Sequence, residues 1–200
     1  MKNHKRTSVR GFALLITLMV VSVVISVTLA IVELSLKQLE LSIDSTDSEL
    51  AFQAANAGLE CARFTRRSET VDFEAGQQID FSCFGDSDPN SPMALGLPLS
   101  GTTANDDVYR YQAEITWGTA PQERCSEIKM ITMIIDAASP GVTMGSVIDP
   151  VRSELPGYPR NTKFCGPGGR CTVVSVTGYS ASCGNKASQS TRSRDILLEF

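Results

Sequence analysis

Histidine is almost missing from this chain of 200 residues, which holds a single one, His4, near its start. Histidine is the commonest general acid–base residue and metal ligand, so sites that need one are excluded beyond residue 4. The chain also lacks a C-x-x-C pair, since its closest cysteines, Cys165 and Cys171, have five residues between them. The sequence therefore argues against a structural zinc site.

Catalytic motifs are equally scarce. Ser126 and Lys129 match the S-x-x-K spacing of serine acylases, but no K-T-G or S-D-N sequence accompanies them. They also fall beside or within a predicted strand and not at the start of a helix. The glycines of the CGPGGRC segment form neither a P-loop nor a dinucleotide-binding fingerprint. We therefore expect a protein that is not an enzyme and has no cofactor.

Charge, proline and glycine are all absent from a run of 21 residues, 12–32. A helix of that length measures about 31 Å and is long enough to cross a bilayer core. Four cations precede it, Lys2, Lys5, Arg6 and Arg10, and no matching cluster follows. The positive-inside rule then places the leader in the cytoplasm and residues 33–200 outside.

Three interpretations of this start compete. A cleaved secretory signal has a shorter apolar core followed by small residues, whereas here the small residue, Gly11, comes before the run. A plain single-pass anchor fits the run, but it requires neither a glycine at the border nor a helix that continues beyond it. A prepilin-type signal fits the basic leader, Gly11, the aromatic Phe12, the apolar helix and its amphipathic extension.

Residues 10–64 resemble the class III signal and N-terminal helix of the type IV pilin and pseudopilin superfamily. The segments RGFALLITLMVV, residues 10–21, and AFQAANAGLECARF, residues 51–64, are most similar to PilX-like and GspK-like minor subunits. The resemblance implies cleavage between Gly11 and Phe12 by a prepilin peptidase and methylation of the new amino terminus. It also implies other pilin subunits, an assembly platform and membrane lipid as partners.

The chain departs from the pattern of major pilins at two positions. Major pilins mostly carry a glutamate at the fifth mature position, where this chain has Ile16. That glutamate is thought to neutralise a neighbouring subunit's terminal ammonium, because an unpaired charge among apolar helices is unfavourable. Its loss indicates a minor or tip subunit. Glu33 stands where many pilins have a kinking proline, so we expect an unbroken helix.

The charge balance bears on the partners. The formal net charge is −4, and removal of the four leader cations leaves −8. Such acidity argues against a broad nucleic-acid-binding face, so we expect no nucleic acid partner.

All six cysteines lie beyond the apolar run, in the part predicted to be exported. An even number there indicates up to three disulfides. Six cysteines can be joined in 15 different ways, so the connectivity stays open. We weakly favour Cys61 with Cys83, which would tie the end of the helix to the first strand region. The candidates are Cys61, Cys83, Cys125, Cys165, Cys171 and Cys183.

The second half of the long helix is predicted over residues 33–66. One apolar stripe follows helical spacing and is expected to pack on the chain's own sheet, with filament packing as the alternative. The stripe contains Leu36, Leu39, Ile43, Leu50, Ala54, Ala57, Cys61 and Phe64. A patch of small residues, Ala54, Ala55, Ala57 and Gly58, permits close approach of another backbone or sheet.

From about residue 68 the sequence turns to short β-prone runs between turn clusters. Strands are predicted over residues 79–84, 108–117, 128–136, 171–182 and 194–200, the last two as a hairpin. Residues 86–107 and 139–169 are predicted to be irregular. A long helix on a small antiparallel sheet is an α+β fold.

A weak calcium candidate lies in the first irregular segment. Asp86, Asp88 and Asn90 follow the D-x-D-x-N start of a calcium loop. The sixth position is Ser91 and the twelfth is Leu97, where an EF-hand needs glycine and glutamate. A solvated acidic turn is the favoured interpretation, and no metal is expected.

These observations predict four parts: a leader (1–11), a membrane-spanning helix (12–32), its amphipathic continuation (33–66) and an extracytoplasmic β-rich domain (67–200). The expected function is a minor or tip subunit of a type IV pilus or type II secretion pseudopilus. Such a protein sits first in the cell membrane, and then in the pilus or at the cell surface. The alternative is a membrane-anchored, adhesin-like surface-binding protein that never enters a filament.

Overall fold

The computed structural model describes residues 10–81, 83, 93–94, 97–98, 107–145, 155, 158, 164–188 and 190–199. The leader residues 1–9 and the calcium candidates Asp86, Asp88 and Asn90 lie outside this set. The chain divides into two compact units, residues 1–45 and 46–200. The fold is α+β, with a long N-terminal helix whose second part packs on a small antiparallel sheet.

Helix α1, Arg10–Ser68, contributes to both units and is 59 residues long. The predicted unbroken helix is confirmed, because residues 12–64 are helical throughout and contain no proline. Among the described residues, helical structure also occurs in α2 (Thr70–Glu74) and in the 3-10 turn η2 (Cys183–Asn185).

The first unit consists of apolar helix without a packed face. Every side chain from residue 12 to residue 45 is exposed, and Phe12 and Leu18 are 69% and 67% exposed. The hydroxyls of Thr17, Ser22 and Thr28 each donate to a backbone carbonyl three or four residues earlier, as does that of Ser26. The helix therefore satisfies these polar groups by itself and needs no outside hydrogen-bond partner for them.

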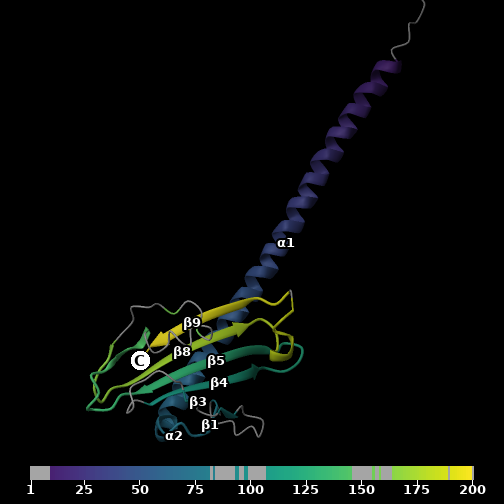
Figure 1. The fold of residues 1–200 in the computed structure, drawn as a ribbon. Helices are drawn as coiled ribbons and strands as arrows, with labels where there is room; N and C mark the ends of the chain where they lie inside the picture. The colour runs from purple at the N-terminus through teal and green to yellow at the C-terminus, as the bar shows by residue number, and fades with distance from the viewer. Residues whose placement is uncertain are drawn as a thin grey trace, which may run out of the picture. The chain divides into compact units, whose positions relative to one another are not determined.

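The main sheet of the second unit has five antiparallel strands in the order β3-β4-β5-β8-β9 (Figure 1). The strands are β3 (Leu97–Pro98), β4 (Asp107–Trp117), β5 (Arg124–Ile134), β8 (Arg170–Tyr179) and β9 (Ser193–Glu199). Burial alternates along β4, as the sequence predicted, because one face meets α1 and the other is partly solvated.

Several predicted strand boundaries were wrong. β5 begins at Arg124, four residues before the predicted start, because β4 remains paired with it until Trp117 stands opposite Arg124. The predicted strand 79–84 is limited among described residues to β1 (Ile79–Asp80). The hairpin of β8 and β9 is confirmed, although β8 ends at Tyr179 and not at residue 182.

Short pairings occur inside both segments that were predicted to be irregular. In the first, β2 (Met93–Ala94) pairs with β1, and β3 adds an edge to β4. In the second, β6 (Val142–Thr143) pairs with β7 (Phe164–Cys165). Two-residue strands leave no apolar/polar period in the sequence, so periodicity alone had no means to detect them.

Glycines allow α1 to approach the sheet closely. A Cβ added at Gly178 of β8 would lie 2.1 Å from the carbonyl oxygen of Ala51 and 2.3 Å from the nitrogen of Ala55. A Cβ added at Gly58 would lie 2.8 Å from both Ser126 Cβ and Val176 Cγ1. The helix backbone therefore rests directly on the strands, as the predicted small-residue patch permits.

A hydrogen-bond chain fixes the helix at this contact. The Trp117 indole nitrogen donates to Ser126 Oγ at 2.6 Å, and Ser126 Oγ donates to the Ala54 carbonyl at 2.6 Å. Ser126 is fully buried, so this bond replaces water for a group that would otherwise be unsatisfied.

The predicted apolar stripe on α1 was only partly right. Ala54 and Cys61 are buried, whereas Phe64 is 47% exposed. Leu36, Leu39 and Ile43 are also exposed, because they lie in the first unit and the sheet contacts begin near Ala51. The face that meets the sheet is set by small residues: Ala51, Ala54, Ala55, Gly58, Cys61 and Ala62.

A second, smaller core lies on the opposite face of the sheet. Ile131 and Met133 of β5 and Val173 of β8 pack there with Met144, Leu155 and other residues of the second irregular segment. The remaining part of this outer face, toward the start of β5, carries polar side chains.

We predict that Gly178→Ala destabilises the second unit by about 3 kcal/mol, because its methyl group would meet helix backbone that is unable to move aside. The measurement is chemical unfolding of the full chain in detergent, followed by the fluorescence of Trp117, the only tryptophan. Gly184→Ala is the matched control, since no atom lies within 4 Å of its added Cβ. Equal stability of the two variants would contradict the close contact.

Candidate functional site

All six cysteines are paired, which confirms the prediction of three disulfides. Cys61–Cys83 joins α1 to the segment after β1, as the sequence favoured. Cys125–Cys183 joins β5 to the connection between β8 and β9, and Cys165–Cys171 closes the β7–β8 turn. The first two link segments that are 22 and 58 residues apart, so they hold long-range contacts of the domain.

The connection between β8 and β9, residues 180–192, is held on the outer face of the sheet and is named the β8–β9 loop. It has its own hydrogen bonds: Ser180 and Arg192 pair through their backbones, and Thr191 Oγ1 donates to the Asn185 carbonyl. Its described exposed residues are small or uncharged polar residues, apart from the cationic Arg192. The loop is therefore an ordered polar surface.

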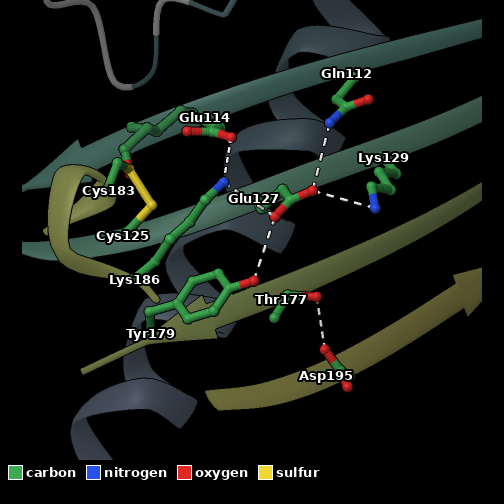
Figure 2. Close-up of polar contacts among 11 residues, drawn as sticks. Gln112, Glu114, Cys125, Glu127, Lys129, Thr177, Tyr179, Cys183, Lys186 and Asp195 are labelled. Atoms are coloured by element: carbon green, nitrogen blue, oxygen red, sulfur yellow. Dashed lines mark hydrogen bonds and ion pairs between the residues drawn. A yellow bond between two sulfur atoms is a disulfide. The ribbon is translucent and has the colours of Figure 1, made fainter. Parts of the chain in front are cut away.

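Lys186 of this loop contacts two glutamates on the outer face (Figure 2). Its ammonium pairs with Glu114 of β4 and lies 3.4 Å from Glu127 Oε2 of β5. The side chain of Glu127 is 13% exposed and that of Glu114 is 42% exposed. Lys186 thus bridges two adjacent strands from above.

Glu127 is the centre of this polar cluster, because both its oxygens accept several hydrogen bonds. Oε1 lies 3.1 Å from Lys129 Nζ and 3.4 Å from Gln112 Nε2, and Oε2 accepts from the Tyr179 hydroxyl at 3.3 Å and from Lys186. Figure 2 shows these side chains pointing toward Glu127. They belong to β4, β5, β8 and the β8–β9 loop. The carboxylate therefore organises its neighbours and is not presented to solvent as an unpaired group.

The electrostatics follow from these contacts. Burial raises the pKa of the Glu127 carboxyl, but hydrogen bonds and charges from Lys129 and Lys186 outweigh it, so the pKa lies below the ordinary 4.5. The bond to Glu114 raises the pKa of Lys186. Burial, and then the charge of Glu127, raises the pKa of Tyr179. At neutral pH Glu127 and Lys186 are therefore ionised, and Tyr179 is neutral.

A second charged cluster closes the far end of α1. Arg66 Nη2 lies 3.3 Å from Glu74 of α2, and Arg170 Nε lies 3.1 Å from the same carboxylate. Arg66 Nε also donates to Thr172 of β8 at 3.3 Å. This arrangement attaches α2 to the sheet and serves packing.

A shallow hollow lies between α1 and the edge strand β9. It is lined by Ser48, Glu49 and Phe52 of α1 and by Arg194 and Asp195 of β9. The Arg194 guanidinium donates to Ser48 Oγ at 2.5 Å, and Asp195 accepts from Thr177 at 2.6 Å. Ser48 and Arg194 are thus bonded to each other across the hollow, and Asp195 is bonded to the neighbouring strand β8.

The sequence-predicted processing residues lie at the start of the first unit. Gly11 and Phe12 belong to the first turns of α1, and Ile16 follows one turn later with 45% of its surface exposed. Helix α1 is the one helix among the described residues with the length and composition to cross a membrane.

Other sequence candidates do not form sites among the described residues. Ser126 faces α1 while Lys129 points to the outer face, so the S-x-x-K pair lies on opposite sides of β5. One group with metal-ligand chemistry occurs in the described part, Glu114 with Cys125 and Cys183. Its two sulfurs are bonded to each other, so no thiolate is present to bind a metal.

The polar cluster has little signal in the sequence. Glu114, Glu127 and Lys186 are spread over three segments, and only the register of β4 with β5 brings the two glutamates opposite each other. The alternation of polar residues in β4 and β5 indicates which side chains share the outer face of the sheet. It does not indicate where the β8–β9 loop lies on that face.

No family model, curated protein or solved structure matches the chain.

We predict that Glu127 stabilises the domain at neutral pH and that this contribution disappears in acid. Because folding lowers its pKa, the stabilisation is fully present above the unfolded value near 4.5 and is lost as pH falls through the folded pKa. The unfolding free energy of Glu127→Gln should therefore fall below that of the parent at pH 7, and the difference should shrink below pH 4.5.

Glu60→Gln is the control, because it removes a glutamate whose side chain is 58% exposed on α1. A difference between parent and Glu127→Gln that stays constant down to pH 2 would contradict the assignment.

Proposed function

We propose that this chain is a pilin-like structural subunit, minor or at the tip, of a type IV pilus or type II secretion pseudopilus. The observation that carries the proposal is the junction where a basic leader and Gly11 meet Phe12 and an uncharged helical run. In this proposal a prepilin peptidase cuts between Gly11 and Phe12, and the new amino terminus is methylated.

The exposed apolar helix supports this proposal. Large apolar side chains from Phe12 to Val32 have no cover within the described chain, so they require an apolar environment. Lipid provides it before assembly, with residues 12–32 spanning the membrane. Helices of other subunits provide it after assembly, when the assembly platform has lifted the subunit out of the bilayer.

The length of the exposed apolar surface favours assembly over permanent anchoring. Beyond the charge-free run, Leu34, Leu36, Leu39, Leu41 and Ile43 are all more than half exposed. Residues 12–43 of a helix span about 48 Å, whereas the bilayer core is about 30 Å thick. A neighbouring helix in a filament would cover the part that lipid does not reach.

The topology proposed for the membrane stage has the second unit outside the cytoplasm. The leader cations favour a cytoplasmic start, and three disulfides form in oxidising compartments beyond the cell membrane. In this state the protein is single-pass, and after assembly it belongs to the pilus or the cell surface.

The competing function is an adhesin-like surface-binding protein held permanently by α1. The ordered polar β8–β9 loop would suit a protein that contacts a partner. The two functions differ in the fate of residues 1–11, which an anchor keeps and a processed subunit loses.

We predict that mass spectrometry of the membrane-derived protein finds a methylated Phe12 at the amino terminus. Gly11→Leu should leave the full-length precursor in the membrane, because the peptidase requires a small residue before the cut. Val9→Leu is the matched control and should be processed normally. Processing of Gly11→Leu at the parent rate, or an intact start in a cell with active prepilin peptidase, would refute the proposal.

A minor position predicts that the protein is scarce in sheared fibres beside a major subunit. Ile16→Glu supplies the carboxylate that a shaft subunit uses toward a neighbour's ammonium, so it should raise the share of this chain in fibres. Ile16→Gln controls for polarity without charge. Parent protein found as the bulk subunit would remove the minor assignment and leave the pilin-like one.

A further inference from the structure

The β8–β9 loop is attached to the sheet by a covalent and an ionic contact at neighbouring positions. Cys183 and Lys186 lie three residues apart on the loop. Their partners Cys125 and Glu127 lie two residues apart on β5 and so point to the same face. Figure 2 shows the disulfide and the ammonium on the same side of the sheet.

The ionic contact joins the loop to two strands of the sheet. Glu114 stands opposite Glu127 in the register of β4 and β5, so Lys186 meets two carboxylates on adjacent strands. Two contacts on different strands define the place of the loop along and across the sheet. At that place the carboxylate of Glu114 and the sulfurs of Cys125 and Cys183 all lie within 4.8 Å of one another.

We propose that Lys186 guides the pairing of Cys183 with Cys125: its contacts with Glu114 and Glu127 dock the reduced loop so that the two thiols meet. Cys125 and Cys183 are 58 residues apart, and six cysteines offer many wrong partners. Docking raises the effective concentration of one thiol at the other without any new covalent bond. The proposal concerns the second unit and does not depend on the pilin-like function.

The chemical step is an ordinary thiol–disulfide exchange with a low-molecular-weight disulfide such as oxidised glutathione. One thiol, as thiolate, attacks a glutathione sulfur, forms a mixed disulfide and releases one reduced glutathione. The second thiolate attacks the protein sulfur of the mixed disulfide and releases another. The protein loses two electrons and two protons, and the two glutathione molecules formed receive them.

Thermodynamic linkage makes the proposal measurable at equilibrium. If the ionic contact stabilises the docked loop, it also stabilises the disulfide. By linkage, the disulfide then stabilises the ionic contact by the same factor. Removing Lys186 must then shift the exchange equilibrium of Cys125–Cys183 toward the thiols. The other two disulfides do not involve the loop, so their equilibria should stay unchanged.

The experiment equilibrates the full chain in detergent with mixtures of reduced and oxidised glutathione. Each cysteine pair is then quantified by differential alkylation and peptide mass spectrometry. Lys186→Met should lower the exchange constant of Cys125–Cys183 roughly three- to tenfold, the range expected for a partly buried charge-assisted contact. High salt should reduce the difference between parent and variant.

Two variants separate guidance from a simple effect of a cation near thiols. Glu127→Gln keeps the ammonium and removes a partner, so guidance predicts a loss in the same direction as Lys186→Met. Lys186→Arg keeps both charge and reach and should retain most of the parent's exchange constant. Lys129→Met is the matched control, because Lys129 also contacts Glu127 but lies on β5 and not on the loop.

The outcomes decide the proposal. A selective loss for Cys125–Cys183 in Lys186→Met and Glu127→Gln, with Lys129→Met like the parent, supports it. An unchanged exchange constant in Lys186→Met overturns it, and so does an equal loss at all three disulfides, which would indicate general unfolding.

Discussion

The second unit depends on the close approach of α1 to the sheet. Gly58 on the helix and Gly178 on β8 have no side chains, so the two backbones are not held apart at these positions. With that gap closed, Ser126 reaches the Ala54 carbonyl, and the short side chains of the helix fill the space over β5 and β8. Larger residues at these positions would lift the helix and expose both the hydrogen bond and the core beneath it.

Because α1 covers one face of the sheet, the smaller core and the polar cluster both lie on the opposite face. At one end it holds the smaller core with Ile131, Met133 and Val173, and at the other it carries the polar cluster around Glu127. The loop between β8 and β9 lies over the polar end. A charged cluster suits this place because the strands supply partners at fixed spacing, and a loop without apolar anchors needs polar contacts to become ordered.

The elements that could be predicted from the sequence are those whose signals are local or repeated. The run 12–32 and the absence of proline predicted α1, and alternation predicted β4. The count and position of cysteines predicted the disulfides. The predicted start of β5 was wrong, because that start is decided by register with β4. The predicted burial of Phe64 was also wrong, because its exposure depends on which face of α1 meets the sheet. The contacts of Lys186 could not be predicted from the sequence, because they join residues that are distant in sequence and that only the topology of the sheet brings together.

The direction of α1 along β8 has a mechanical consequence. As the helix advances from Ala51 to Arg66, its neighbours on β8 go back from Gly178 to Thr172, so the two run antiparallel. A pull along the helix axis would therefore load their interface in shear, with many contacts resisting together instead of opening one after another. Cys61–Cys83 adds a covalent link near the end of that interface. Tension on the helix would therefore reach the domain as a load distributed over the whole interface.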